Sequence, residues 1–387
     1  MRFMSETALS ALTGSRVDER VRAHIWYDGQ VVAPDLDLAD WQVSSDGSRQ
    51  VRTQTSLTVV DPDGILTPWG VDDALGVGGA RAQLIYEISG GETVDLGFFR
   101  ITGSDPAENW NLKNGAVWVS GGATIPVQAD DLTTIAVADR LLSAESPKAG
   151  ATVLSEVRRL LNGIMPVTVA AGVTDRAVAT TTVYERERMD AVEDLLKSIS
   201  CTHRMTGDGQ LEVYPAAVAA PVWEIAGGDD GVMISVRRSQ SSSALYNAAV
   251  AIGATPDGRQ LVARAFELSG PLRWEGPHWR RTYFQDSSGI LTTQSAVEAA
   301  VKSVLAGQLR GRTVDLQVTC LPHPGLQPGD AVSVSVPTVT GEAMSLVGVV
   351  RTTSLRGTAA GVSPMTMTVE CAYEDVQAVA AAIRRAS

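Results

Sequence analysis

Few groups of residues in this sequence have the types and spacing that phosphate or metal chemistry requires. A phosphate-binding loop needs a glycine-rich turn followed by Lys-Ser or Lys-Thr, but the run Gly76, Gly78 and Gly79 has no such continuation and enters a strand-like segment. The histidines stand alone, without HExxH or another paired zinc-ligand spacing. They are His24, His203, His278 and His323. We therefore predict no cofactor-binding residue and no metal ligand.

Adjacent carboxylates occur at three places, and a glycosidase also uses a pair of carboxylates. Its two groups must face each other across a cleft, however, and neighbours in sequence do not supply that geometry. Each pair stands beside turn signals, where Asp closes turns and caps helices. The pairs are Asp72 and Asp73, Asp130 and Asp131, and Asp229 and Asp230. The serine hydrolase motif GxSxG is absent. We predict no catalytic residue and a protein that is not an enzyme.

The most distinctive cluster is aromatic, between Arg273 and Phe284. Its candidate interface aromatics are Trp274, Trp279, Tyr283 and Phe284, interleaved with arginines. Aromatic residues with arginine are typical of protein interfaces, and they also stack on sugars. Three interpretations remain open: a loop packed on its own domain, a protein contact, or a glycan site.

The charge of the chain bears on its partners. The formal net charge is −12, which argues against a nucleic-acid-binding protein, because such proteins neutralise phosphates with Lys and Arg. The acidity favours solubility and repulsion between copies until specific faces meet.

The cysteines and the hydropathy indicate in which cellular compartment the protein is made. Cys201, Cys320 and Cys371 are too few and too dispersed for a disulfide framework, so we predict reduced thiols. The first 20 residues lack the apolar core of a signal peptide, and no window approaches 18 consecutive apolar residues. We expect a protein that is made in a cytoplasm and has no membrane span.

The first part of the chain is predicted to consist mainly of β-strands. A chain of 387 residues is long enough for two or three domains. Residues 1–15 are predicted to form an N-terminal helix or arm, with a helix at 4–13. Residues 16–145 show alternating hydrophobicity broken by turn signals, which predicts a first β-barrel-like domain. Its expected strands include 51–60, 80–88, 94–101 and 116–120.

Helical spacing then replaces the alternation. Apolar residues recur along one face of 151–164 and again of 187–200, and Asp208 and Gly209 mark a hairpin after the second helix. Residues 146–221 are therefore predicted to be a mixed α/β domain.

The last part returns to strands. Residues 222–376 are predicted to form a second β-region or barrel with one helix, 295–310, where Ser295 and Glu298 have the spacing of a capping box. Residues 377–387 form a C-terminal tail, and we expect a short helix over 374–387. The predicted fold class is β-rich α+β, with two β-barrel-like domains and inserted mixed α/β parts.

Seven stretches, in this order, resemble the minor tail proteins of actinobacteriophages and the tail-hub, or baseplate-hub, proteins of long-tailed phages. None is a catalytic signature, so the resemblance depends on their order and spacing across most of the chain. The stretches are RAHIWYDG at 22–29, RTQTSLTVVDP at 52–62, LGFFRI at 96–101, YERERMDAV at 184–192, GDGQLEVYP at 207–215, LYNAAVAIG at 245–253 and PHPGLQPGD at 322–330.

The resemblance implies the phage tail-hub fold and a structural protein of the virion, at the phage tail tip. Such hubs are typically homotrimers whose two barrels present a quasi-sixfold surface to the tail tube. Implied partners are a second and third copy, the distal tail protein, the tail tube protein, the tape measure and the tip or fibre proteins, with only passive contact with DNA in transit. The expected role is a hub or adaptor that joins tube and distal ring to the central tip.

Three other functions remain open. A distal tail ring protein would differ from a hub in stoichiometry and position. A carbohydrate-binding host-adhesion protein would need the aromatics of 273–284 to form an exposed platform. A cell-wall hydrolase would need a clustered acid, base or metal site, which the sequence does not show.

Overall fold

The computed structural model describes residues 1–13, 19–88, 91–113, 117–178, 180, 182–229, 231–239, 245–255, 259–277, 279–286, 293–310, 313–337 and 343–386. The chain divides into two compact units. Unit 1 consists of Met1–Val236, Gln317–Pro337 and Ala343–Val369, and unit 2 of Arg237–Leu316, Thr338–Glu342 and Glu370–Ser387. Strands make up 45% and helices 16%, which confirms the predicted β-rich α+β class. No helix of the described residues is long and apolar enough to cross a membrane.

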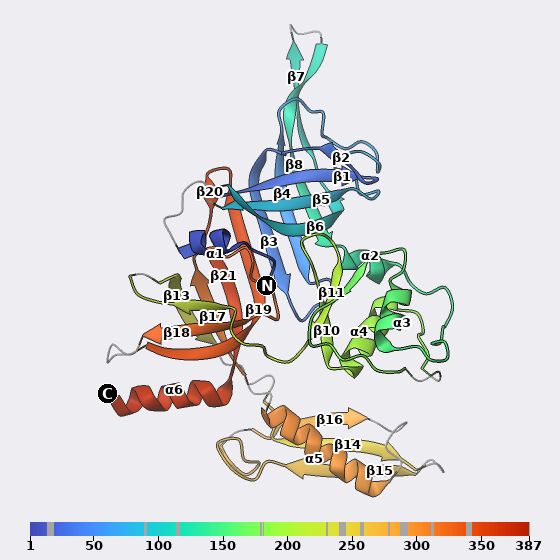
Figure 1. Ribbon diagram of the computed structural model, residues 1–387, viewed down its shortest axis with the longest axis vertical. Coiled ribbons are helices and arrows are strands. Elements are labelled where there is room, and N and C mark those ends of the chain that lie inside the picture. Colours follow the sequence, from blue (N-terminus) through green and yellow to red (C-terminus); the bar gives the residue numbers. More distant parts are fainter. Residues whose placement is uncertain are drawn as a thin grey trace. The chain divides into compact units, whose positions relative to one another are not determined.

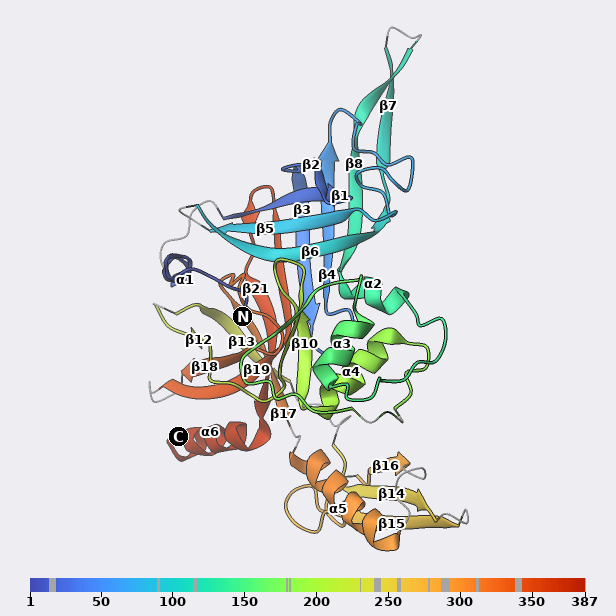
Figure 2. The same cartoon turned by 45° about the vertical axis from the view of Figure 1, so that its right-hand side comes forward.

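The N-terminal half of unit 1 is an antiparallel sheet in the order β3-β4-β8-β6-β5-β1-β2, with β7 paired to β8 (Figure 1). Its alternating sequence buries every second side chain, as in β5, where Ala82, Leu84 and Tyr86 are fully buried. In both views the β7–β8 hairpin extends away from the rest of the sheet (Figure 2). The strands are β1 (Arg20–Tyr27), β2 (Gln30–Ala33), β3 (Leu38–Asp46), β4 (Thr53–Asp61), β5 (Arg81–Ile88), β6 (Glu92–Ser104), β7 (Ala107–Lys113) and β8 (Val117–Asp131).

The N-terminal helix α1 (Glu6–Thr13) confirms the prediction for 4–13. The hydroxyl of Ser5 accepts a hydrogen bond from the backbone N–H of Ala8 at 2.9 Å, as a helix-capping side chain does. Ala8 and Leu12, one turn apart, are fully buried. The apolar face of α1 therefore fixes it to the unit.

One long strand joins the beginning and the end of the chain. The first half of β19 (Ala343–Thr358) pairs with β18, and its second half, Thr352–Thr358, pairs antiparallel with Asp40–Asp46 of β3. The large sheet thus has fifteen strands. Among the described strands, the first and the last in the order, β13 and β2, do not pair with each other, so these pairings do not close a barrel. The closure into two barrels stays a prediction. The other strands are β12 (Trp223–Ala226), β13 (Met233–Ser239), β17 (Thr313–Cys320), β18 (Ala331–Pro337), β20 (Gly361–Val362) and β21 (Met365–Ala372).

The mixed α/β part of unit 1 contains helices and a separate small sheet of order β10-β11-β9. Thr152 and Ser155 form the capping box that starts α3, and the apolar faces of α3 and α4 share one core with the sheet. The predicted hairpin is confirmed, with Gly209 at φ +81°. The elements are α2 (Thr133–Ala138), α3 (Val153–Leu160), β9 (Val167–Val169), α4 (Arg188–Ser198), β10 (Cys201–Met205) and β11 (Leu211–Pro215).

Unit 2 contains a small α/β module, residues 245–310, in which one helix covers one face of a three-stranded sheet. The sheet has the order β15-β14-β16, and the helix α5 (Gln294–Arg310) confirms the prediction for 295–310. The strands are β14 (Ala248–Ala254), β15 (Gln260–Phe266) and β16 (Thr282–Asp286). The final helix α6 (Tyr373–Ala386) confirms the expected C-terminal helix. The predicted domain boundaries at 145 and 221 stay a prediction.

Candidate interaction surfaces

The four predicted aromatics all belong to the module, and they divide into two packed and two exposed side chains. Trp274 packs on Phe266, with ring centroids 5.0 Å apart, and Tyr283 meets Tyr246 edge to face at 5.3 Å. Trp279 is 88% exposed and Phe284 is 67% exposed. A packed loop therefore describes Trp274 and Tyr283, whereas Trp279 and Phe284 are available to a partner.

Asn247 positions the segment that carries Trp279. Its side chain is fully buried, its Oδ1 accepts from the backbone N–H of Arg281 at 2.8 Å, and its Nδ2 donates to the carbonyl of Trp279 at 3.3 Å. The guanidinium of Arg281 lies over the ring of Tyr246, 5.3 Å from its centroid. Sequence reasoning did not single out Asn247, although it lies in the stretch LYNAAVAIG.

Among the described residues of the module no helix covers the face of the sheet opposite α5. The core beneath α5 is made by Ala249, Ala251 and Ala263 with the helix residues Val297, Val301 and Leu305. Because side chains alternate along strands, the other face carries the alternate positions. These positions include Val250, Ile252, Val262, Arg264, Phe266 and Phe284, with Val250 paired to both Arg264 and Phe284. By register the same face also carries positions Ala248, Gln260, Thr282 and Asp286. We call this set the open face.

The segment that contains the module differs in the sign of its charge from the rest of the chain, and the module itself, with seven basic and five acidic side chains, has a net charge of +2. Residues 237–316 hold ten basic and six acidic side chains, a net charge of +4. Because the whole chain has a net charge of −12, the remaining residues have a net charge of −16. The basic side chains accompany the aromatics, as with Arg280, whose guanidinium lies 5.1 Å from the centre of the Trp274 ring.

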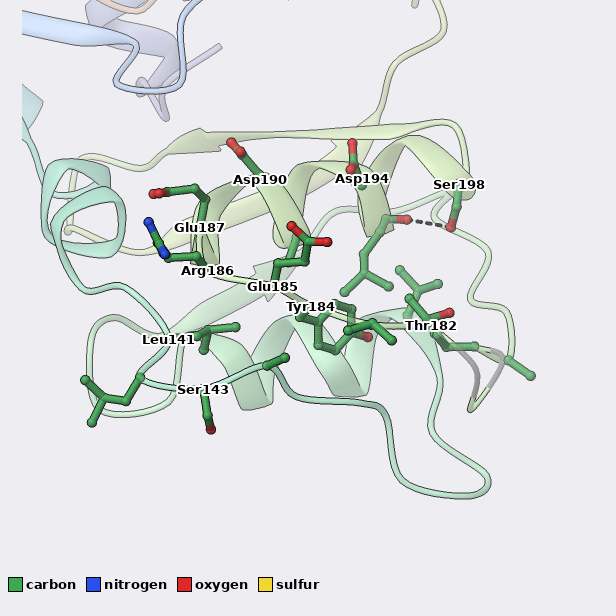
Figure 3. Close-up of a pocket in the computed structure, with 18 of the residues that line it drawn as sticks. Leu141, Ser143, Thr182, Tyr184, Glu185, Arg186, Glu187, Asp190, Asp194 and Ser198 are labelled. Atoms are coloured by element: carbon green, nitrogen blue, oxygen red, sulfur yellow. Dashed lines mark hydrogen bonds between the residues drawn. The ribbon is translucent and has the colours of Figure 1, made fainter. Parts of the chain in front are cut away.

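Unit 1 has a large acidic groove along α4 (Figure 3), with a volume of about 1350 Å³. It is lined by residues 141–144, 176–178 and 182–187 and by one side of α4. Figure 3 shows the carboxylates at its edge and Tyr184 beneath them. The acidic lining residues are Glu185, Glu187, Asp190 and Asp194, and with the lining residues Arg176 and Arg186 the groove has a net charge of −2.

The acidic groove also offers apolar surface. Leu142 is fully exposed, and Val183 is 57% exposed. At its base Tyr184 is buried, and this burial, with the nearby Glu156 carboxylate, raises the pKa of Tyr184 to about 12. Tyr184 is therefore not a base at neutral pH. The groove combines carboxylates with aliphatic side chains, a surface suited to a basic and apolar partner.

The glycine run and Asp73 have turn roles in unit 1, whereas Asp130 and Asp131 are the last residues of strand β8. The N–H of Gly78 donates to the carbonyl of Val71 at 2.6 Å, and a Cβ on Gly78 would lie 2.4 Å from that oxygen. Asp73 accepts from the backbone N–H groups of Trp69 and Gly70, and these bonds lower the pKa of Asp73. Asp230 lies outside the described residues.

The histidines are spread over the chain, and His278 lies outside the described residues. His203 is buried, and desolvation followed by the charge of Arg52 lowers its pKa to about 3. His323 packs edge to face on Trp223, with centroids 4.6 Å apart. Among the described residues no three His, Cys, Asp or Glu side chains come close enough to hold a metal ion.

No protein-family model and no curated protein matches the sequence. Two solved structures match at the level of the fold. The tail protein from Neisseria meningitidis MC58 is 13% identical, with a TM-score of 0.58, over 90% of this chain and 96% of that one. The 43 kDa tail protein of prophage MuSo2 from Shewanella oneidensis is 11% identical, with a TM-score of 0.56, over 90% of this chain and 98% of that one. The chain shares its fold with these two tail proteins.

The shared fold extends over nearly the full length of both tail proteins, so it is not a likeness of one common module. At these identities it is a statement about the fold, since folds are reused for different functions. The interface role of Trp279 and Phe284 accordingly stays a proposal.

Proposed function

We propose that the chain is a non-enzymatic structural protein of a phage tail, a hub or adaptor that joins the tail tube and distal tail ring to the central tip. The observation that carries this proposal is the fold shared with two tail proteins over 90% of the chain. The actinobacteriophage relationship rests on the seven sequence stretches and is part of the proposal.

In this role the protein acts by assembling. We propose a homotrimer, bound to the distal tail protein and the tail tube protein on one side and to tip or fibre proteins on the other. The fifteen-stranded sheet is the framework of each copy, because β19 pairs with both β18 and β3 and so joins strands from the two ends of the sequence. The tape measure and DNA would pass through the assembled ring without specific binding.

Exposed apolar side chains in unit 1 support a role in assembly. Ile65 and Trp69 are each 80% exposed, and Val71 is 64% exposed. The buried carboxylate of Asp61 binds the backbone of residues 65–67, and Asp73 binds the backbone N–H groups of Trp69 and Gly70, so the loop presents these side chains in a defined arrangement. Large exposed apolar groups on an ordered loop are typical of a surface that a neighbouring protein covers.

The copy number in intact tails tests the proposal. We would identify the protein in purified virions by mass spectrometry and count its copies in an image reconstruction of the tail tip. Three copies around the tail axis are expected for the hub. Six copies would indicate a distal tail ring, and a stable monomer absent from virions would contradict the proposed function.

A carbohydrate-binding role in host adhesion is the second candidate, since the exposed ring of Trp279 offers a stacking surface for a sugar. Glycan-array binding by the full chain, lost in Trp279→Ala and kept in the packed-core control Val301→Ile, would favour this candidate.

A further inference from the structure

The open face of the module is an unusual surface for a free protein. Val262, Phe266 and Phe284 are 40%, 42% and 67% exposed, and they lie on one side of a sheet whose other side is closed by α5. A half-buried sheet normally places polar residues on its solvent side. Here six of the ten positions are apolar, and Arg264 of the edge strand β15 is registered opposite Val250 of the central strand β14.

The composition of the open face indicates the chemistry of its partner. Its apolar side chains need an apolar surface, and Arg264, with Arg273, Arg280 and Arg281 on the neighbouring loop, needs carboxylates. Arg and aromatic side chains together are enriched at interfaces, where the guanidinium pairs with acids and the rings exclude water.

The chain itself contains a surface of matching chemistry. The acidic groove of unit 1 joins the carboxylates of Glu185, Asp190 and Asp194 to the exposed aliphatic side chains of Leu142 and Val183. Its volume of about 1350 Å³ accommodates several large side chains at once. Residues 237–316 have a net charge of +4 and the remaining residues a net charge of −16. These opposite charges attract the two parts of neighbouring copies to each other beyond the residues in contact.

We infer that the open face of one copy docks in the acidic groove of a second copy. This inference rests on the proposed function, and it specifies how the copies of the ring meet. The contact is heterologous, because the two patches belong to different parts of the chain. A heterologous contact that closes on itself forms a ring, as a hub of three copies requires.

The first experiment measures the mass of the purified full chain by light scattering and its self-association constant by sedimentation. Arg264→Glu on the open face, and Asp190→Lys with Asp194→Lys in the groove, each place like charges together. We expect each variant to weaken self-association about 100-fold. We also expect wild-type association to weaken at about 0.5 M salt, because salt screens the attraction.

Matched controls separate the docking surfaces from general charge effects. Lys302→Glu changes the same charge in the same module, but Lys302 is an exposed residue of α5, which covers the other face of the sheet. Asp40→Lys with Asp105→Lys reverses two exposed acids of unit 1 away from the groove lining and from the loop that carries Ile65 and Trp69. Both controls should associate as the wild type does, and unfolding midpoints should show that every variant is folded.

Mixing the two reversed variants tests the pairing directly. The intact module of the groove variant meets the intact groove of the Arg264→Glu variant, so the mixture should associate although neither variant does alone. If the mixture does not associate, the inference is wrong. That result is the one expected if the module instead docks within its own chain.

Two further outcomes separate this inference from the proposed function. If copies ring the tail axis in virions while the reversed variants associate normally, the inference is wrong and the proposed function stands. If the wild type binds only a different tail protein through the open face, the inference is also wrong. If the chain is absent from virions, the proposed function is wrong, whatever the self-association experiments show.

Discussion

Arg204 of β10 donates from Nη1 to Oδ1 of Asp330 at 3.0 Å, a largely buried ion pair between residues 126 positions apart. Arg204 also binds Glu212 at 2.6 Å, and its guanidinium lies 4.7 Å from the centre of the Tyr214 ring. The pair fastens the small sheet of the mixed α/β part to the turn that precedes β18. Both parts belong to unit 1.

Replacing Arg204 should destabilise unit 1. In Arg204→Met the buried carboxylate of Asp330 keeps the ammonium of Met1 and the N–H of Gln327 as partners but loses its guanidinium. Removing one member of a buried pair costs roughly 3–5 kcal/mol, and the remaining partners favour the low end, about 3 kcal/mol. Urea denaturation of the full chain measures this loss.

A double substitution is the control for this pair. In Arg204→Met with Asp330→Asn the buried uncompensated charge is removed, so the loss should be smaller than the sum of the two single losses. Strict additivity would show that the two side chains do not interact in the folded protein.

The turn that contains Asp330 shows both the reach and the limit of sequence reasoning. The stretch PHPGLQPGD predicts a turn before a strand, and Pro322–Pro328 is a buried segment leading to β18. Its partners could not be predicted, because nothing in the sequence pairs Asp330 with Arg204. Such contacts are set by tertiary packing between distant segments, which leave no periodic pattern.

Five of the six helices of the described residues were predicted, because each has an apolar period, whereas the six-residue helix α2 is too short to show one and was missed. The expected helices at 151–164 and 187–200 correspond to α3 (Val153–Leu160) and α4 (Arg188–Ser198), and the first ends early because Leu161 leaves the helical conformation at φ −98° and ψ 4°. Strand pairing was harder. The junction of β19 with β3 and the parallel pair of β14 with β16 depend on long-range register, which alternation alone does not determine.

The candidate site was predicted in part. Aromatic and arginine composition drew attention to Trp279 and Phe284, both of which are exposed. Phe266 and Arg264 were missed, although the alternation of 260–266 places them on one face. The acidic groove could not be found from sequence, since its carboxylates come together only when residues 182–187 lie along α4.

His203 should make the protein sensitive to acid. Its pKa is lowered to about 3 in the folded protein, whereas an unfolded histidine has its pKa near 6.5. Between these values the unfolded state binds the extra proton, so this histidine makes stability fall as pH falls from about 6.5 toward 3, by roughly 1 kcal/mol per pH unit. His203→Leu should show a shallower loss of stability between these pH values. Equal slopes for both proteins in urea denaturation would contradict the prediction.

Asp61 should control the loop that carries the exposed Ile65 and Trp69. Its buried carboxylate accepts from the backbone N–H groups of Ile65, Leu66 and Thr67 at 3.1, 2.7 and 3.1 Å. In Asp61→Ala these donors lose their acceptor, at a cost of about 1–3 kcal/mol for a buried unsatisfied group. Hydrogen exchange at residues 65–67 should accelerate at least tenfold. Asp63→Ala, at an exposed neighbour, should leave exchange unchanged.

The three thiols should report unfolding of the whole chain. Cys201, Cys320 and Cys371 are buried free cysteines, and burial raises the pKa of Cys371 to about 11, with Asp375 and Asp315 adding to the effect. Burial also raises the pKa of Cys201. Because the thiolate is the reactive form, native protein at pH 8 should react with a thiol reagent far more slowly than a small thiol does.

The same reaction in urea should accelerate in step with unfolding measured by circular dichroism, and Cys371→Ser should remove one of three labelled sites. Fast labelling of Cys371 in native protein would instead show that β21 opens locally, because access to that thiol requires its strand to separate from the core.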